Sequence, residues 1–372
     1  MTHTRIAILG ATGSIGRQAL DVVAAHRDRL QIVALAAGRD EDTLGHLARE
    51  TGATATAVHA RDGDDALCDM ATRPDVDLVL VATPGIAGLK PTIAALEAGK
   101  RVALANKEVL VTGGHLVAPL AGGAGDKLRP VDSEHCALWQ CLAGERIADV
   151  KRVFLTASGG PFREQDIASL AGVTAADALK HPTWKMGPKV TIDSATLANK
   201  GYEVVETRWL YDIPYEKIEI VVHPESVVHA MVELADGSVK AQLAEPDMRL
   251  PIQYALLWEH APSPARALDW SAARTLRFTG APDLERYPAL AAVLDTARSG
   301  NSAAMVGLSA ADEVAVDRFL RGEIRFTDIA PLLRRGASVG AKAARSDAPA
   351  LNDILAIDRA VRDALAAEPA LR

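Results

Sequence analysis

The start of the chain places a glycine-rich turn between an apolar run and a helical pattern. Residues 5–9 (RIAIL) are followed by GATGSIG at residues 10–16, after which apolar residues recur at helical spacing. Strand, glycine turn and helix in this order are typical of a dinucleotide phosphate site. There Gly10 permits the tight turn, Gly13 lets backbone amides approach a pyrophosphate, and Gly16 lets helix and strand pack closely. The order favours this interpretation over an ordinary glycine-rich loop.

The end of the second predicted strand bears on which nicotinamide cofactor is bound. Residues 31–36 form that strand, and Ala37, Gly38, Arg39 and Asp40 follow it. In NAD sites an acid near this point binds the ribose hydroxyls, whereas an Arg can accept a 2′-phosphate. Arg39 therefore favours NADP. The alternative is a surface ion pair between Arg39 and Asp40, which would contribute little to stability.

Strand and helix patterns alternate over the first third of the chain. Apolar runs lie at residues 54–58, 77–81 and 101–105, and helical segments lie near residues 41–50, 63–71 and 86–98. This alternation predicts an α/β fold with a doubly wound, Rossmann-like parallel sheet. Ligands of such sheets bind beyond the carboxyl ends of the strands.

Polar residues follow two of the predicted strands, which end at Ala105 and Val131: Asn106, Lys107 and Glu108 after the first, and Asp132, Ser133 and Glu134 after the second. In an extended segment, Asp132 and Glu134 would point to one side and would repel each other unless a cation or substrate lay between them. They therefore indicate part of a metal site. Solvated loop acids, and a Lys107–Glu108 salt bridge, are the structural alternatives.

The middle third predicts a second, α+β domain with an open mixed sheet. Strands are expected at residues 151–155 and 219–222, and a hairpin at residues 227–243 turns at Asp236-Gly237. Residues 181–188 (HPTWKMGP) are too irregular for a helix or strand. Such a segment suits a lid over a site, or else a structural surface loop.

The last third is predicted to be a helical bundle. Helical patterns cover residues 288–298, 301–321, 327–333 and 350–367, with Asn301 and Thr327 as expected helix caps. The sequence thus divides into four predicted parts: residues 1–149 for cofactor binding, residues 150–257 for catalysis, a linker at 258–284, and a helical domain at 285–372.

Composition excludes several classes of function. The 372 residues are 49% hydrophobic, enough for a sizeable core, and the net charge of −7 argues against a duplex nucleic-acid surface. No window could span a bilayer, and the first residues do not resemble a signal peptide, so a cytoplasmic protein is expected. Cys68, Cys136 and Cys141 form no CxxC pair and are expected to be reduced thiols.

Seven ordered motifs across nearly the whole chain resemble the 1-deoxy-D-xylulose 5-phosphate reductoisomerases of the non-mevalonate isoprenoid route: GATGSIG, LANKE, PVDSEH, ASGGPF, HPTWKMGPKVTIDSATLANKG, HPESVVH and EPDMR. Arg39 and Asp40 depart from this pattern, since relatives often carry Lys and Asn there. The resemblance implies a homodimer, while the charge and hydropathy given above predict no nucleic-acid or membrane partner.

By this resemblance, Asp132, Glu134 and Glu203 hold a magnesium or manganese ion, as hard carboxylates suit. Lys107 and His181 join them as catalytic residues. The substrate-binding residues it implies are Lys107, Ser133, Glu134, Ser158, His181, Trp184, Met186, Ser194, Asn199, Lys200 and Glu203. The NADPH-binding residues it implies are Thr12, Gly13, Ser14, Ile15, Gly38, Arg39, Asp40, Asn106, Glu108 and Gly187. His223 and His229 receive no role.

The resemblance also implies a reaction in two stages. The ion acts as a Lewis acid while 1-deoxy-D-xylulose 5-phosphate rearranges to a branched aldehyde, and NADPH then reduces that aldehyde to 2-C-methyl-D-erythritol 4-phosphate. Two alternatives stay open. Another NADP-dependent sugar-phosphate or amino-acid dehydrogenase would need no metal site, and a non-catalytic NADPH-sensing regulator would bind the cofactor without turnover.

Overall fold

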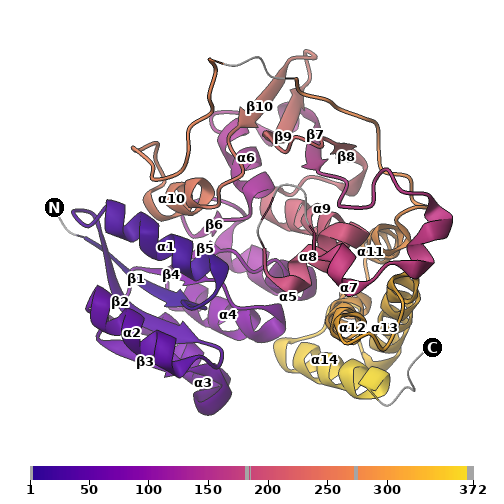
Figure 1. The fold of residues 1–372 in the computed structure, drawn as a ribbon. Helices are drawn as coiled ribbons and strands as arrows, with labels where there is room; N and C mark the ends of the chain where they lie inside the picture. The colour runs from indigo at the N-terminus through magenta and orange to yellow at the C-terminus, as the bar shows by residue number, and fades with distance from the viewer. Residues whose placement is uncertain (1–2, 181–183, 185, 272–274, 367–372) are drawn as a thin grey trace. The chain divides into compact units, whose positions relative to one another are not determined.

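The computed structural model describes residues 3–180, 184, 186–271 and 275–366 of the chain (Figure 1). These residues form two compact units. Unit 1 consists of residues 1–109, 116–143 and 247–269, and unit 2 consists of residues 110–115, 144–246 and 270–372. The four-part division of the sequence by role stays a prediction.

Unit 1 contains a six-stranded, fully parallel sheet in the order β3-β2-β1-β4-β5-β6. Its strands are β1 (Thr4–Leu9), β2 (Leu30–Ala37), β3 (Ala55–Val58), β4 (Leu78–Val81), β5 (Arg101–Leu104) and β6 (Leu128–Pro130). This is the order of a doubly wound dinucleotide-binding sheet, in which the chain starts at the centre and winds outward in both directions. The predicted Rossmann-like sheet is confirmed.

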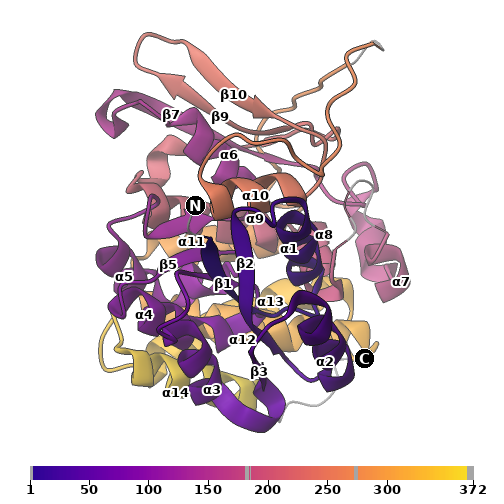
Figure 2. The ribbon, with the colours of Figure 1, turned by 90° about the vertical axis from the view of Figure 1, so that its left-hand side faces the viewer.

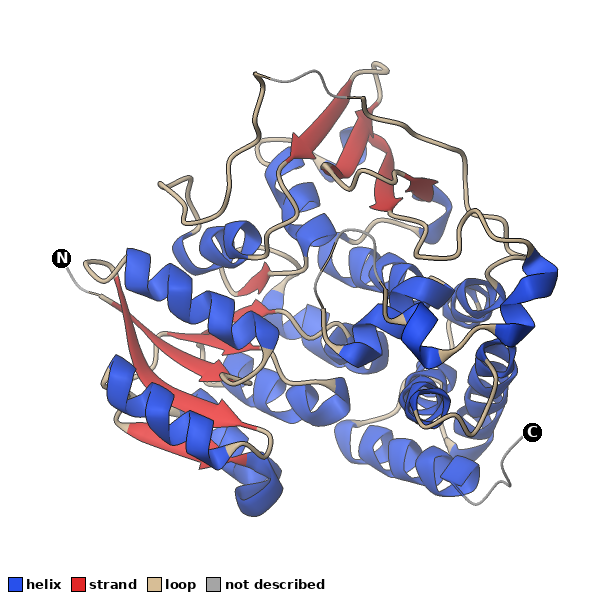
Figure 3. Cartoon of the chain, viewed as in Figure 1, coloured by secondary structure: helices blue, strands red, loops and turns tan. Residues whose placement is uncertain are grey.

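Helices cover both faces of this sheet (Figure 3). They are α1 (Ser14–Ala25), α2 (Glu41–Thr51), α3 (His59–Thr72), α4 (Leu89–Glu97), α6 (Ser133–Cys141) and α10 (Arg249–Leu257), with the short 3-10 helix η1 (Gly85–Gly88). Helix α5 (Glu108–Ala121) has residues in both units.

Helix α10 comes from far along the chain, yet it packs beside α1 on the sheet of unit 1 (Figures 1 and 2). Its Ile252, Ala255 and Leu256 are buried in the same apolar cluster as Ile6 and Val22. Burial of this kind is the main favourable term in folding. Helix α10 is therefore part of the core of unit 1.

Local signals at the ends of α2 explain why that helix forms where it does. The Asp40 carboxylate accepts a hydrogen bond from the Thr43 backbone amide at 3.1 Å and caps the helix start. Glu41 and Asp42 lie in the first turn, where the helix dipole stabilises negatively charged side chains. Gly52 ends the helix with φ of 74°, a left-handed conformation that favours glycine.

Unit 2 contains a four-stranded mixed sheet in the order β10-β9-β7-β8. Its strands are β7 (Val150–Ala157), β8 (Ile218–Val222), β9 (Val228–Leu234) and β10 (Val239–Leu243). Strand β7 pairs in parallel with β8 and antiparallel with β9. Strands β9 and β10 form the predicted hairpin, and Gly237 in its turn has φ of 88°. The predicted mixed sheet is confirmed.

The helices of unit 2 include the predicted carboxyl-terminal bundle. They are α7 (Ala175–Ala178), α8 (Pro188–Thr196), α9 (Ala198–Tyr211), α11 (Pro288–Arg298), α12 (Ser302–Leu320), α13 (Ile329–Ala343) and α14 (Leu351–Ala366), and short 3-10 helices cover Ile147–Asp149, Ile167–Gly172, Tyr215–Lys217 and Phe326–Asp328. Helices α12 and α13 cross closely at glycines, since a Cβ on Gly307 would lie 2.2 Å from the Gly336 carbonyl oxygen.

Of the two predicted caps, one is confirmed. The Asn301 side chain accepts a hydrogen bond from the Ala304 amide at 2.8 Å at the start of α12. Thr327 was the wrong choice, because α13 follows a 3-10 turn and its N-cap is Asp328. The described part of residues 258–284 has no helix or strand, and Thr279 makes an isolated bridge to Val222.

Two further expectations from the composition can be compared with the structure. Cys136 and Cys141 are buried free thiols, and burial raises the pKa of Cys136 to about 12. Cys136 is therefore a packed, unreactive side chain, as expected. Among the residues that the structure describes, no helix is both long and apolar enough to cross a membrane.

Candidate functional site

The glycine turn after β1 requires glycine at two positions. Gly10 has φ of 98°, and a Cβ on it would lie 2.4 Å from the Ala82 carbonyl oxygen at the end of β4. A Cβ on Gly16 would lie 2.3 Å from the Gly10 carbonyl oxygen. The tight turn predicted at Gly10 and the close packing predicted at Gly16 are confirmed. Any side chain at Gly16 would push α1 away from the turn.

The amino end of α1 leaves room for an anionic ligand. Gly13 is the N-cap, no side chain caps the helix, and its first turn contains no acid. Gly13 and Ser14 are exposed, while Thr12 and Ile15 are half-buried. Free backbone amides at a helix start attract phosphate oxygens. The contact of these four residues with NADPH stays a prediction.

Arg39 and Asp40 do not pair with each other in the described part of the chain. Asp40 caps α2 instead, and the hydrogen bonds from Thr43 lower the pKa of its carboxyl. The surface ion pair considered from the sequence is therefore absent there. Gly38, Arg39 and Asp40 are all exposed just beyond β2. Arg39 is thus available for a ligand at the carboxyl edge of the sheet.

Asn106, just beyond β5, joins two loops of this edge. Its amide nitrogen donates to the carbonyl oxygens of Thr83 and Gly85, the latter at 2.8 Å, and its side-chain oxygen accepts from the Val109 amide at 2.9 Å. The side chain is only 3% exposed. Asn106 therefore fixes the loop after β4 against the start of α5. Glu108, the predicted cofactor residue that follows Asn106 in the set, is also buried.

Lys107 and Asp132 form an ion pair at the carboxyl ends of β5 and β6. The Lys107 ammonium lies 3.0 Å from the Asp132 carboxylate, and the side chains are 10% and 15% exposed. The buried His135 lies 3.5 Å from the same carboxylate. The structure thus brings together two of the predicted catalytic residues within unit 1.

The predicted extended conformation of residues 132–134 was wrong. Asp132 is the N-cap of α6, accepting the Ser133 amide at 3.0 Å, and Glu134 lies in the first turn of that helix. The reason is that Asp in this position satisfies a free helix amide, so that the chain turns into a helix directly after β6. Ser133 donates its hydroxyl to the Glu134 carboxylate at 2.6 Å.

Glu203 lies in unit 2, on α9, and is 1% exposed. Its carboxylate accepts hydrogen bonds from Asn199 at 2.6 Å and from the buried Lys200. Residues three and four apart on a helix lie on one face, so α9 itself gathers this trio. Three predicted substrate-binding residues are therefore neighbours within unit 2.

Two further predicted residues, Ser158 and Ser194, each lie next to Gly160. Ser158 follows β7, and its hydroxyl oxygen accepts the Gly160 amide at 3.2 Å. A Cβ on Gly160, which has φ of 69°, would lie 2.9 Å from the Ser194 carbonyl oxygen on α8. The Tyr287 hydroxyl donates to the Gly159 carbonyl at 2.9 Å and holds the loop.

Half of the predicted lid, including His181, lies outside the described residues. Trp184 is half-buried and its ring lies 6.0 Å from that of His229, while Gly187 is the exposed N-cap of α8. His229 itself is 6% exposed on β9. Met186 is half-buried. The lid stays a prediction.

His223, which received no role from the sequence, organises the loop between β8 and β9. Its Nε2 accepts the amides of Val227 and Val228, each at 3.1 Å, so its Nδ1 carries the proton and donates to the Arg277 carbonyl at 2.8 Å. The ring stacks on Phe278 at 4.5 Å. The motif HPESVVH contained this histidine, but only the backbone partners reveal its structural role.

The acidic residues fit a hard divalent cation in their chemistry and charge. Asp132 and Glu203 are largely buried carboxylates, and each has a lysine ammonium beside it. Burying a carboxylate without positive charge is costly, so these positions suit cations. Carboxylate oxygens are the ligands that magnesium and manganese prefer. The sharing of one ion by Asp132, Glu134 and Glu203 stays a prediction.

Comparison with known protein families decides the identity. Three models match: the 1-deoxy-D-xylulose 5-phosphate reductoisomerase model at residues 6–62 and 40–114, that family's C-terminal domain at residues 128–211, and the DXP reductoisomerase C-terminal domain at residues 243–364. The reductoisomerase of Thermomicrobium roseum is 46% identical over 371 residues, covering 96% of this chain and 95% of that protein. The chain belongs to the 1-deoxy-D-xylulose 5-phosphate reductoisomerase family.

Other members of the reductoisomerase family agree in sequence and in structure. The protein of Chlorobium chlorochromatii is 46% identical over 96% of this chain and 97% of its own length. A crystal structure of DOX-P reductoisomerase with NADPH, fosmidomycin and magnesium superposes with a TM-score of 0.90 at 36% identity, covering 98% of each chain. The Zymomonas mobilis enzyme in complex with NADPH gives 0.86 at 39% identity, over 98% of this chain and 99% of that one.

Proposed function

We propose that this protein is an NADPH-dependent enzyme that converts 1-deoxy-D-xylulose 5-phosphate to 2-C-methyl-D-erythritol 4-phosphate. Family membership over nearly the whole chain supports the reaction. One structural observation carries the proposal further. The Lys107–Asp132 ion pair lies at the carboxyl edge of a dinucleotide-binding sheet, the same edge that carries the glycine turn after β1 and the exposed Arg39 after β2. This is the edge where such sheets bind their ligands.

We place the divalent cation, magnesium or manganese, on Asp132, Glu134 and Glu203. When bound, the ion would supply Lewis acidity that stabilises the negative charge on the substrate oxygens. The protein would contribute the arrangement of its ligands. Ser133 orients Glu134, and Asn199 orients Glu203, each through a hydrogen bond of 2.6 Å. Such bonds fix the direction of a ligand carboxylate.

We place the substrate phosphate on Ser158, Ser194, Asn199 and Lys200, with Lys107, Ser133 and His181 along the remainder. Hydroxyl, amide and ammonium groups are suitable partners for phosphate oxygens. The close approach of Gly160 to Ser194 supports the two serines as neighbours, and Asn199 and Lys200 both bond to Glu203 on α9. Binding energy from this remote phosphate can order Trp184 and Met186 over the site and exclude water.

We place NADPH along the carboxyl edge of the unit 1 sheet. The pyrophosphate would lie at Thr12, Gly13, Ser14 and Ile15, at the start of α1, and Arg39 would bind the 2′-phosphate with Gly38 and Asp40 beside it. Asn106, Glu108 and Gly187 would lie nearer the nicotinamide. The cofactor supplies the hydride, and the protein supplies its position relative to the substrate.

A coupled assay tests the proposal against its alternatives. NADPH absorbance is followed with 1-deoxy-D-xylulose 5-phosphate, with and without a chelator, and the product is identified by mass spectrometry. We expect oxidation of NADPH only with substrate and metal, together with formation of the branched polyol phosphate. Turnover that survives the chelator would favour another dehydrogenase, and binding of NADPH without turnover would favour a regulator. The expected homodimer and cytoplasmic location stay predictions.

A further inference from the structure

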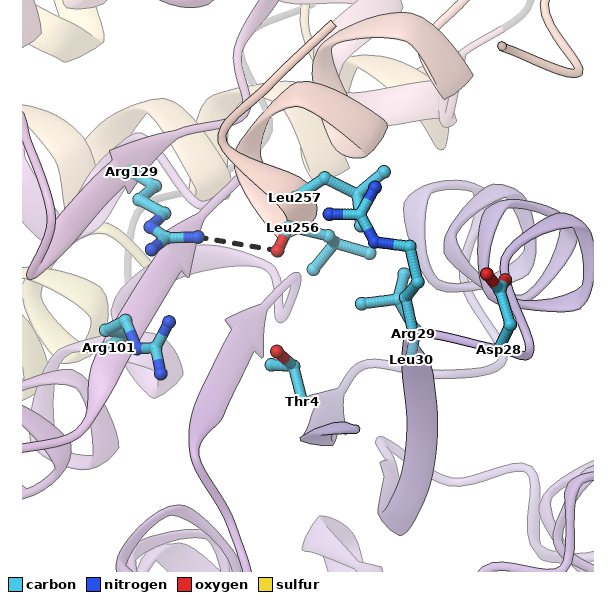
Figure 4. A pocket seen from close by; sticks show the side chains of 8 residues that line it. All are labelled: Thr4, Asp28, Arg29, Leu30, Arg101, Arg129, Leu256 and Leu257. Atoms are coloured by element: carbon cyan, nitrogen blue, oxygen red, sulfur yellow. Dashed lines mark hydrogen bonds between the residues drawn. The ribbon is translucent and has the colours of Figure 1, made fainter. Parts of the chain in front are cut away.

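A cavity of about 350 Å³ lies at the amino ends of the unit 1 strands, at the edge of the sheet opposite to the glycine turn (Figure 4). Thr4 and Leu30 begin β1 and β2, Arg101 begins β5, and Arg129 lies on β6. The end of α10 closes the cavity with Leu256 and Leu257. All its walls belong to unit 1.

More basic than acidic side chains line the cavity. Three arginines, Arg29, Arg101 and Arg129, line it, against one acid, the exposed Asp28. Arg129 is 3% exposed. Burial lowers the pKa of Arg129, and the charge of Arg101 adds to this effect. Two guanidinium groups that repel each other in a partly dry cavity would gain from a shared anion.

Two of the three arginines already have partners. Arg29 pairs with Glu259 at 2.5 Å. Arg129 pairs with Asp126 at 3.0 Å and donates to the carbonyl oxygens of Ala255 and Leu256 at 3.1 and 3.4 Å, the second of which is drawn in Figure 4. These bonds fix the Arg129 guanidinium in one position, so that little conformational entropy would be lost on ligand binding.

Arg101 differs from the other two. Its side chain makes no hydrogen bond or ion pair with any residue that the structure describes, although it is half-buried. The acid whose pKa it influences is Asp77, and both oxygens of that carboxylate already accept hydrogen bonds from Arg5, at 2.8 and 3.0 Å. Arg101 thus presents a free guanidinium to the cavity, beside the fixed Arg129.

We propose that this cavity binds the phosphate group of a small organic phosphate, with Arg101 and Arg129 as its anion partners. Arginine forks match phosphate oxygens in geometry as well as in charge. The volume exceeds that of a bare phosphate and falls at the lower end of the range for small-molecule sites. Leu30, Leu256 and Leu257 offer an apolar wall to the carbon part of the ligand.

This site is separate from the proposed cofactor site. The cofactor lies beyond the carboxyl ends of the strands, and the cavity lies at their amino ends. Strand β1 has six residues, so the two edges are about 20 Å apart at a rise of about 3.3 Å per residue. A ligand in the cavity would therefore bind without displacing NADPH.

Hydrogen exchange on the full-length protein, titrated with butyl phosphate or inorganic phosphate, tests the proposal. Exchange is followed in peptides that contain residues 27–31, 100–104 and 255–260, because the active site of this family also binds a phosphate. We expect butyl phosphate to slow exchange in these peptides. Its affinity, read from the titration, should exceed that of inorganic phosphate. Arg101→Ala should lower the affinity for butyl phosphate about tenfold or more, since a charge-assisted hydrogen bond is lost.

Matched variants keep the test decisive. Arg49→Ala removes an exposed arginine on α2 of the same unit and should leave the protection unchanged. Arg101→Gln retains most of the stem and, with unchanged thermal unfolding, separates loss of binding from loss of folding. The proposal is overturned if these peptides show no protection, if Arg101→Ala retains the affinity, or if inorganic phosphate binds as tightly as butyl phosphate.

Discussion

The ammonium group of Lys107 lies 3.0 Å from the carboxylate of Asp132 and joins the ends of two neighbouring parallel strands. Because both side chains are largely buried, removing either charge would leave the other without compensation. Lys107→Met should reduce kcat/KM roughly 100-fold, as expected when a positioned charge is removed from an active site. Steady-state kinetics with saturating NADPH measure the effect. Lys90→Met, which removes a more exposed lysine paired with Asp65, is the control and should retain normal activity.

Glu203→Gln tests the third metal ligand. The amide keeps the size of the side chain but removes its negative charge, so turnover should be abolished while NADPH affinity stays nearly intact. Cofactor binding is measured by fluorescence titration and turnover by NADPH oxidation. Glu216→Gln changes an exposed acid of the same unit and serves as control. Near-normal activity of Glu203→Gln with added magnesium would exclude Glu203 as a ligand.

Arg39→Ala tests how the protein distinguishes NADPH from NADH. Loss of one charge-assisted partner of the 2′-phosphate should weaken NADPH binding roughly 10- to 100-fold and leave NADH binding almost unchanged. The matched control is Arg61→Ala, because Arg61 is an exposed arginine already paired with Glu41 and Asp62. Equal losses for the two cofactors would mean that the 2′-phosphate is bound elsewhere.

Gly16→Ala tests the close approach of α1 to the glycine turn. A new Cβ would lie 2.3 Å from the backbone oxygen of Gly10, which cannot move aside as a side chain could. The free energy of unfolding in urea should fall by roughly 1–3 kcal/mol. Gly45→Ala, where the nearest atom is the Arg49 guanidinium at 3.6 Å, should instead stabilise the protein by up to about 1 kcal/mol. Equal effects would contradict the turn geometry.

Asp77 should make stability depend on acid pH. Hydrogen bonds from Arg5 lower the pKa of the Asp77 carboxyl below its ordinary value of 3.8. Its stabilising effect, about 1 kcal/mol for a partly exposed pair, is complete above about pH 5 and is lost as the pH falls through the lowered pKa. Urea unfolding of Asp77→Asn should show a deficit at pH 7 that shrinks at pH 3. A deficit independent of pH would mean that the carboxylate charge is not responsible.

The parts of the fold that the sequence predicts well are those with local signals. The glycine turn, the Asp236-Gly237 hairpin and the Asn301 cap each follow from a few neighbouring residues. The alternating runs of unit 1 predict its sheet because parallel strands buried on both faces are continuously apolar. Family motifs add candidate site residues, which local patterns alone leave open.

Helices that are buried on all sides were the main elements that the sequence did not predict. Helix α6 has no amphipathic stripe, because seven of its nine residues are buried, and so residues 132–134 suggested an extended segment. A helix running through Glu206 could be considered from the sequence, but most of α9 is buried, so hydrophobic periodicity does not show that Asn199 and Lys200 lie near Glu203. Hydrophobic periodicity appears only where one face of a helix meets water. The backbone bonds of His223 depend on long-range folding and have no local pattern.

Helix α10 has a consequence for how the protein is made. Unit 1 begins at the amino terminus but needs Ile252, Ala255 and Leu256 to cover the apolar surface around Ile6 and Val22. During translation that surface stays uncovered until residue 257 has been synthesised, more than a hundred residues after the end of β6. A fragment cut after Ala143 would therefore expose apolar side chains and tend to aggregate, so the first 143 residues cannot simply be expressed as a separate protein.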